Sequence, residues 1–334
     1  MSDRKKDHID LAFRSATARD TVDRRFDYEP VLAAHPKDDL TPFPFLGKEM
    51  KAPLWISSMT GGTGPARHIN QNLARACGEF GLGMGLGSCR PLLEDDTFFE
   101  DFNLRGLIGD QAPFFANLGI AQVQKALEEK RADRIIELVV RLKADGLIIH
   151  VNPLQEWLQP EGDRIKVPPL ETVQAFLGQF ELPVIVKEVG QGMGPSSLRA
   201  LLELPLAAID FAAYGGTNFA RLEMLRAPET WQEFYGPLAS IGHDAEEMMQ
   251  MVNDHIDSGT YVRCKHIIVS GGIRNFLDGY YLISRSKLPA IYGQASSLLK
   301  YANESYDRLH DFVQSQIKGL RLAETFVKLK ISEP

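Results

Sequence analysis

Eight short apolar runs recur along the chain, and each ends in glycine or in polar residues. Segments with helical periodicity lie between most of them, for example at residues 120–144 and 196–204. Nearly continuous apolar strands that alternate with amphipathic helices predict a parallel sheet with helices on its outer face. The runs are residues 53–62, 81–90, 113–119, 146–153, 183–190, 207–216, 266–272 and 289–295.

Eight such units predict an α/β protein with a single (β/α)₈ TIM barrel. An open doubly wound sheet is the alternative, but "GLGMGLGS" does not open a helix with an acidic residue beyond it, so the dinucleotide-binding pattern is weak. We expect residues 1–50 to form an N-terminal arm and lead-in, and residues 51–334 to form the barrel. An insertion, residues 224–262, separates strands six and seven. A helix begins there near Asp244, and its Met248, Met249 and Val252 are expected to pack in the core. Residues 305–329 are amphipathic and predict the last barrel helix.

Composition narrows the function classes. The 334 residues are 44% hydrophobic, enough for a large core, and the net charge of −7 argues against a nucleic-acid partner. Cys77, Cys89 and Cys264 are not at metal-binding spacing, which predicts free thiols in a reducing compartment. No run is apolar and long enough to span a membrane, and no apolar targeting segment follows the basic start. We therefore expect a cytoplasmic protein.

Polar and small residues gather at the strand ends, where barrel enzymes place their active sites. The turn "SGGIR" after strand seven and "YGQA" in strand eight allow backbone N–H groups to approach a phosphate. Lys187 ends strand five and can stabilise an anion over the mouth. These features favour an FMN site with the phosphate at strands seven and eight. Its predicted contacts are Ser58, Met59, Thr60, Ser88, Asn117, Lys187, Thr217, Gly271, Gly272, Arg274, Gly293, Gln294 and Ala295.

Several motifs occur together in one order along the chain: "RKKDHI", "ISSMTGG", "GSCR", "ANLG", "HVNPLQEWLQPEGD", "VIVKEVG", "GGTN" and "SGGIRN". In this the sequence resembles type II isopentenyl-diphosphate isomerase, from about Arg4 to the last helix. The long motif is highly specific, whereas "SGGIRN" is shared with other FMN barrels. The resemblance implies interconversion of isopentenyl and dimethylallyl diphosphate with reduced FMN and Mg²⁺, and NADPH as the reductant.

The same resemblance implies roles for individual residues. Glu156 would bind the Mg²⁺ that bridges the substrate diphosphate. Gln155 would face the substrate carbons, and Lys187 would stabilise the anionic flavin ring, so these two are the expected catalytic residues. The residues expected to bind the substrate are Arg4, Lys5, His8, Arg90, His150, Asn152 and Gln155. The arm that carries the first three would order over the site or come from a neighbouring subunit of a homo-oligomer, a tetramer or octamer.

Two alternatives remain. An FMN-dependent 2-hydroxy-acid oxidase needs a histidine base in an "HGGR" turn after strand six, but here Tyr214 stands in that position and Thr217 replaces the arginine. Tyrosine is too weak a base at neutral pH, which argues against the oxidase. A barrel that binds flavin or a prenyl diphosphate without turnover is favoured by departures from the family pattern, among them Cys89, Val189 and the stretch around strand eight. Lys187, Gln155 and Glu156 favour catalysis instead.

Overall fold

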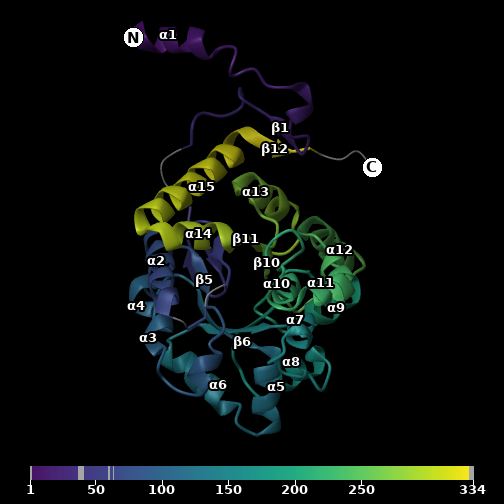
Figure 1. The fold of residues 1–334 in the computed structure, drawn as a ribbon. Coiled ribbons are helices and arrows are strands. Elements are labelled where there is room, and N and C mark those ends of the chain that lie inside the picture. Colours follow the sequence, from purple (N-terminus) through teal and green to yellow (C-terminus); the bar gives the residue numbers. More distant parts are fainter. Residues whose placement is uncertain (1, 37–40, 59–60, 63, 331–334) are drawn as a thin grey trace.

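The fold is a closed barrel of eight parallel strands, in the neighbour order β10-β11-β4-β5-β6-β7-β8-β9. The computed structural model describes residues 2–36, 41–58, 61–62 and 64–330. Each of the eight apolar runs contributes one strand, so the predicted (β/α)₈ barrel is confirmed (Figure 1). The strands are β4 (Leu54–Ile56), β5 (Gly83–Gly85), β6 (Phe114–Gly119), β7 (Gly146–His150), β8 (Val184–Lys187), β9 (Ala208–Asp210), β10 (Ile267–Ser270) and β11 (Ala290–Gln294).

Helices surround the barrel in chain order (Figure 1). Their apolar sides pack on the outer faces of the strands, which is why the strand runs are almost wholly apolar. Before β9 they are α2 (Gly64–Phe80), η2 (Arg90–Leu93), α3 (Phe99–Phe102), α4 (Arg105–Ile108), α5 (Ile120–Glu128), α6 (Asp133–Arg141), α7 (Pro153–Leu158), α8 (Pro169–Leu177) and α9 (Pro195–Leu202). After β9 they are α10 (Phe219–Arg226), α11 (Glu229–Tyr235), η3 (Gly236–Ser240), α12 (Ala245–Asp257), α13 (Phe276–Arg285), α14 (Ser296–Glu304) and α15 (Tyr306–Phe326).

The insertion between β9 and β10 follows the sequence expectation. Helix α12 starts after Asp244, whose side chain accepts the N–H of Glu247 in a capping box. Met248, Met249 and Val252 are buried in the core between helices and barrel. The three cysteines are buried free thiols, also as expected.

A second apolar cluster fills the inside of the barrel. Trp55 of β4 belongs to it together with Phe115 and Ile148, and the Trp55 ring contacts the Phe115 ring edge-on. A Cβ added to Gly83 would lie 2.4 Å from the Trp55 ring, so the glycine-rich strand β5 makes room for the indole. The hairpin of β2 (Phe43–Phe45) and β3 (Lys48–Met50) adds apolar side chains to this cluster.

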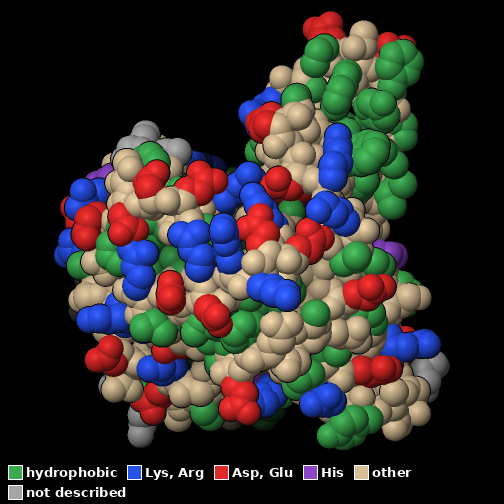
Figure 2. Space-filling view, turned by 90° about the horizontal axis from the view of Figure 1, so that it is seen from below, with side chains coloured by type: hydrophobic (Ala, Val, Ile, Leu, Met, Phe, Trp, Pro, Cys, Tyr) green, Lys and Arg blue, Asp and Glu red, His purple; other side chains and the backbone are tan. Residues whose placement is uncertain are grey.

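The segment before the hairpin lies on the outside. Helix α1 (Ser2–Leu11) projects away from the barrel, followed by η1 (Arg19–Thr21) (Figure 1). Strand β1 (Phe26–Tyr28) then pairs antiparallel with β12 (Val327–Leu329), next to α15. On the face drawn in Figure 2, acidic and basic side chains are intermingled, without the broad basic surface that nucleic acid would need.

Candidate functional site

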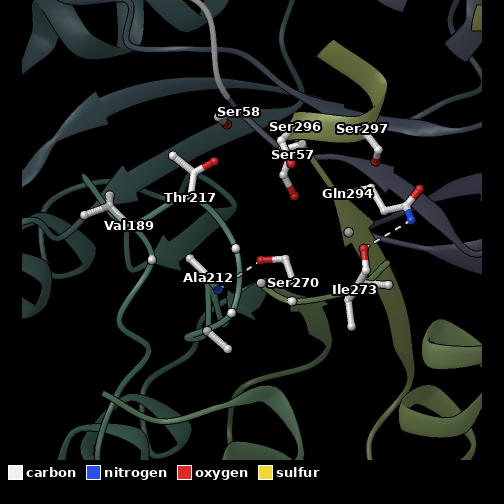
Figure 3. A pocket seen from close by; sticks show the side chains of 18 of the residues that line it. Ser57, Ser58, Val189, Ala212, Thr217, Ser270, Ile273, Gln294, Ser296 and Ser297 are labelled. Atoms are coloured by element: carbon white, nitrogen blue, oxygen red, sulfur yellow. Dashed lines mark hydrogen bonds between the residues drawn. The ribbon is translucent and has the colours of Figure 1, made fainter. Parts of the chain in front are cut away.

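A cavity of about 420 Å³ opens where strands β4, β8, β9, β10 and β11 end. Its volume lies in the range of roughly 300–1,000 Å³ that is usual for cofactor pockets. Nine residues predicted to bind FMN line it: Ser58, Lys187, Thr217, Gly271, Gly272, Arg274, Gly293, Gln294 and Ala295. Ser296 and Ser297 also line the cavity from the first turn of α14, although no sequence motif marks them (Figure 3). Lys300, one turn further along α14, lines it as well.

One end of the cavity suits an anion. Helix α14 begins there, and its first N–H groups have no partner within the helix. Lys300 on α14 and Arg274 after β10 add positive charge to the same lining. Gly293 is needed nearby, because a Cβ there would lie 2.6 Å from the Ser57 hydroxyl.

Two glycine pairs bring the ends of β9 and β10 together. Gly271 has a φ of +89°, and an added Cβ would lie 2.1 Å from the carbonyl oxygen of Ala213. Gly216 packs less closely on the backbone of Gly272, where a Cβ would lie 3.3 Å from the nitrogen. The double glycines therefore permit contact between two turns that both line the cavity.

Lys187 lies at the inner wall and is only 7% exposed. Its Nζ donates a hydrogen bond to the carbonyl oxygen of Glu188 at 2.7 Å. Asp210 is its register partner on β9 and is fully buried. Burial raises the pKa of Asp210, while the Lys187 charge and a hydrogen bond from the Ser270 hydroxyl oppose the shift. The Lys187 ammonium is therefore a buried cation in this wall of the cavity, held by the Glu188 carbonyl oxygen next to Asp210.

Several buried polar atoms at the mouth have no partner within the described residues. They include the hydroxyl oxygens of Ser57 and Ser58 and the Oε1 of Gln294. The Nε2 of Gln294 donates to the carbonyl oxygen of Ile273 at 3.3 Å, which fixes the amide (Figure 3). Because buried polar groups are normally paired, these atoms fit a ligand that carries both donors and acceptors, as a flavin does.

The motif at residues 150–163 forms a hydrogen-bonded group at the end of β7. Asn152 donates through Nδ2 to Gln155 Oε1 at 3.1 Å and to Glu156 Oε1 at 3.0 Å. The other Glu156 oxygen accepts the N–H of Asp163 at 2.7 Å. Asn152 Oδ1 is buried without a partner in the described structure. Glu156 and Asn152 thus supply a carboxylate and an amide oxygen, the type of ligand that Mg²⁺ prefers.

Glu223 of α10 completes this group, and the sequence reasoning missed it. One of its oxygens accepts from Gln155 Nε2 at 3.3 Å and from Gln159 Nε2 at 2.9 Å. The other oxygen pairs with Arg226 at 2.7 Å. Gln155 is therefore held at both ends of its amide. Only the 68-residue separation of the partners hid this contact, since no local pattern marks it.

His150 is a neutral imidazole in this environment. Burial and the nearby Lys187 charge lower its pKa to about 3. Its Nδ1 lies 2.9 Å from Asn117 Oδ1, while Asn117 Nδ2 donates to the carbonyl oxygen of Leu86. The Asn117 oxygen is thus the acceptor, and His150 donates from Nδ1. Asn117 is engaged below the mouth and does not line the cavity.

The second predicted region, around Gln155, borders a neighbouring cavity of about 320 Å³. Asn152, Gln155 and Glu188 line it, and Val189 lines both cavities. Gln155, predicted to face the substrate carbons, thus lies beside the predicted flavin cavity.

Other predicted residues lie elsewhere. Arg90 is exposed, pairs with Asp163 at 2.9 Å and lines a separate groove against α5 and α6. Ser88 lies just before it and accepts the Arg90 N–H at 3.4 Å. Arg4, Lys5 and His8 are exposed on α1, away from both cavities. Met59 and Thr60 fall outside the described residues.

Two features are absent from the described residues. No group of three or more His, Cys, Asp or Glu side chains is arranged to hold a metal ion there. No helix in the described ranges has the length and apolar character needed to cross a membrane.

The closed ring of parallel strands with helices around it, and the cavity at the strand ends, define a (β/α)₈-barrel protein with a ligand site. Solved structures agree on the fold. A mandelate oxidase variant with a monooxide FMN adduct matches with a TM-score of 0.55 and 14% identity, covering 92% of this chain and 88% of that one. A flavocytochrome b2 variant with sulfite bound matches with a TM-score of 0.61 and 14% identity, covering 97% and 85%. At such identities the likeness shows the fold alone.

Curated relatives carry the assignment further. Isopentenyl-diphosphate delta-isomerase of Rickettsia akari is 36% identical over 279 residues, which are 83% of this chain and 78% of the relative. The Rickettsia typhi protein of the same name is 31% identical over 325 residues, 96% and 92% of the two chains. No family model matches the chain. The chain belongs to the isopentenyl-diphosphate delta-isomerase family.

Proposed function

We propose that this chain interconverts isopentenyl and dimethylallyl diphosphate as a type II isomerase that uses FMN, with NADPH as reductant, and Mg²⁺. The observation that carries the proposal is the pairing of two adjacent cavities. One has an anion-binding end, unpaired polar atoms and Lys187. The other is lined by Gln155 and Asn152. The family membership supports the substrate.

The residues of the first cavity fit FMN. Its phosphate would lie where α14 begins, near Gly271, Gly272 and Arg274. Ser58 and Gln294 would satisfy their buried atoms on the flavin. When bound in reduced form, FMN would supply a site that gives and takes a proton and an electron-rich ring beside the substrate carbons. Lys187 would stabilise that ring's negative charge, and its burial makes the interaction strong.

Residues of the β7 motif would bind the substrate. Glu156 would bind Mg²⁺ with help from Asn152, whose Oδ1 has no partner in the described structure, and substrate phosphate oxygens and water would complete the coordination. Glu223 would hold the Gln155 amide in one orientation toward the reacting carbons. Neutral His150 offers an Nε2 lone pair, so its contact with a diphosphate requires that the bound anion raise its pKa or that a proton come from the ligand.

The proposed reaction needs a proton added to one carbon and another removed from a very weak acid. Positioning of the substrate by its remote diphosphate lowers the entropic part of that barrier. Exclusion of water strengthens each electrostatic contact at the reacting carbons. The homo-oligomer, the cytoplasmic location and the contribution of the N-terminal arm stay predictions.

The test is an anaerobic assay of the purified protein with isopentenyl diphosphate, Mg²⁺, FMN and NADPH or dithionite, followed by NMR in heavy water. Formation of deuterated dimethylallyl diphosphate only with reduced flavin would support the proposal. A protein that binds flavin tightly but forms no product would instead be a binding barrel without turnover. Oxidation of a 2-hydroxy acid would favour the oxidase, although Tyr214 and Thr217 stand where that family needs histidine and arginine.

A further inference from the structure

Arg25, in the segment before β1, contacts the barrel next to the turn proposed to bind the FMN phosphate. Its Nη1 lies 2.9 Å from Oδ1 of Asp278 on α13. The other Asp278 oxygen accepts the backbone N–H of Arg274 at 3.1 Å and lies 3.5 Å from Arg274 Nε. Arg274 lines the flavin cavity. A single carboxylate therefore joins the N-terminal segment to the cavity wall.

The contact is held more firmly than an ordinary surface ion pair. Asp278 is buried, with 6% of its surface exposed. The Arg25 guanidinium lies 5.2 Å from the centroid of the Phe26 ring and 5.1 Å from that of Tyr281. Asp23 pairs with the same guanidinium at 2.7 Å. Because Phe26 begins strand β1, which pairs with β12, the backbone beside Arg25 is also fixed.

The ion pairs of Asp278 affect how the Arg274 guanidinium is presented to the cavity. A lone Asp278 would neutralise Arg274 and draw its guanidinium back along α13. Arg25 shares that carboxylate, and Asp23 balances the Arg25 charge, so the four side chains are neutral together but Asp278 is not bound to Arg274 alone. The Arg274 side chain is 84% exposed and free to meet an anion.

We infer that Arg25 is a positioning residue for the phosphate of a flavin nucleotide, acting through Asp278 on Arg274. The inference rests on the proposed FMN site. It assigns the N-terminal segment a role in cofactor affinity that does not require α1 to reach the barrel mouth.

The test compares FMN with riboflavin, which has the same ring and lacks the phosphate. Both would be titrated with the purified full-length chain by flavin fluorescence. Arg25→Ala should raise the Kd for FMN by about two- to fivefold, the effect of one partly exposed ion pair, and leave the Kd for riboflavin unchanged. Arg25→Lys should retain most of the FMN affinity.

Controls separate this role from a general effect of charge or folding. Arg24→Ala removes the same charge from the neighbouring exposed position and should change neither Kd. In an Arg274→Ala background, a further Arg25→Ala change should have no effect on the FMN to riboflavin ratio. Melting temperatures would confirm that each variant is folded.

The outcomes are distinct. Equal loss of FMN and riboflavin affinity would mean that Arg25 only supports the fold, and would overturn the inference. So would an unchanged FMN Kd in Arg25→Ala when Arg274→Ala weakens FMN binding. Failure of the unaltered protein to bind either flavin would overturn the proposed function itself, and the inference with it.

Discussion

Gly271 offers a sharp test of how the cavity wall is built. Its φ of +89° lies in a region that residues with a Cβ rarely adopt. A Cβ there would lie 2.1 Å from the carbonyl oxygen of Ala213 and 2.3 Å from its nitrogen. Both atoms belong to the backbone of the neighbouring strand end, so the clash cannot be relieved by a rotamer change.

The cost of Gly271→Ala can be summed from two effects. The left-handed backbone costs a residue with a Cβ about 1–2 kcal/mol. Moving the Ala213 backbone away would break its 2.9 Å hydrogen bond to the Ser270 carbonyl, at a further cost of about 0.5–1.5 kcal/mol. With the residual overlap, we expect Gly271→Ala to lower the free energy of unfolding by about 3 kcal/mol and to weaken flavin binding.

Gly272→Ala is the matched control. Its φ is +73°, but the nearest atom to an added Cβ is 3.3 Å away, so only the backbone term of about 1–2 kcal/mol should apply. Both variants would be compared by urea unfolding and flavin titration. Equal destabilisation by the two changes would refute the reasoning, because the backbone clash would then carry no energy.

Four further predictions concern single side chains. Glu156→Gln should raise the Mg²⁺ concentration needed for half-maximal activity by about tenfold, because a hard cation loses an anionic oxygen ligand, and it should leave the Kd for FMN unchanged. Wild-type activity of this variant at low Mg²⁺ would contradict the metal role. Lys187→Ala should weaken binding of reduced FMN by about tenfold or more, as expected for a lost charge-assisted contact, and an unchanged Kd with full activity would exclude that role. Glu223→Gln should lower kcat by about tenfold because Gln155 loses its charged acceptor, while flavin affinity, measured in parallel, stays the same. His150 has its folded-state pKa lowered from 6.5 to about 3, so the unfolded chain binds the extra proton and stability falls as pH drops from 6.5 toward 3. Between pH 6.5 and 5, urea unfolding of His150→Gln should show roughly 1.5 kcal/mol less of this loss than the wild type, and identical profiles would contradict the assignment.

The barrel was predictable because its signals are local. Each strand is an apolar run that stops at glycine or a polar residue, and burial on both faces requires such a run. The pairing of β1 with β12 was not predictable, since three-residue strands 301 positions apart leave no periodic pattern. The same holds for the β2–β3 hairpin at the inner cluster.

The site residues were also predictable where their signal is local, and were not where their partners lie far away in the sequence. Residues at strand ends, such as Lys187 and Gly293, come together because the barrel places all carboxyl ends at one mouth. Glu223 and Arg25 act through contacts with residues far away in sequence, so nothing near them in the chain marks their partners. Arg90 was assigned to the substrate by its motif, yet it pairs with Asp163 and lines a groove separate from both cavities.

The pairing of β1 with β12 can form only after all the barrel strands between them have been synthesised. Strand β1 is made before all eight barrel strands, but its partner Val327–Leu329 is made after them. Until then the early segment has no sheet to join, and Ile9, Phe13 and Val31 remain exposed even in the folded chain. Arg25 reaches Asp278 only after α13 exists. The nascent chain therefore carries β1 without its partner while the barrel between them is made, and a ribosome stalled before β12 would hold a barrel whose N-terminal segment still lacks its sheet partner.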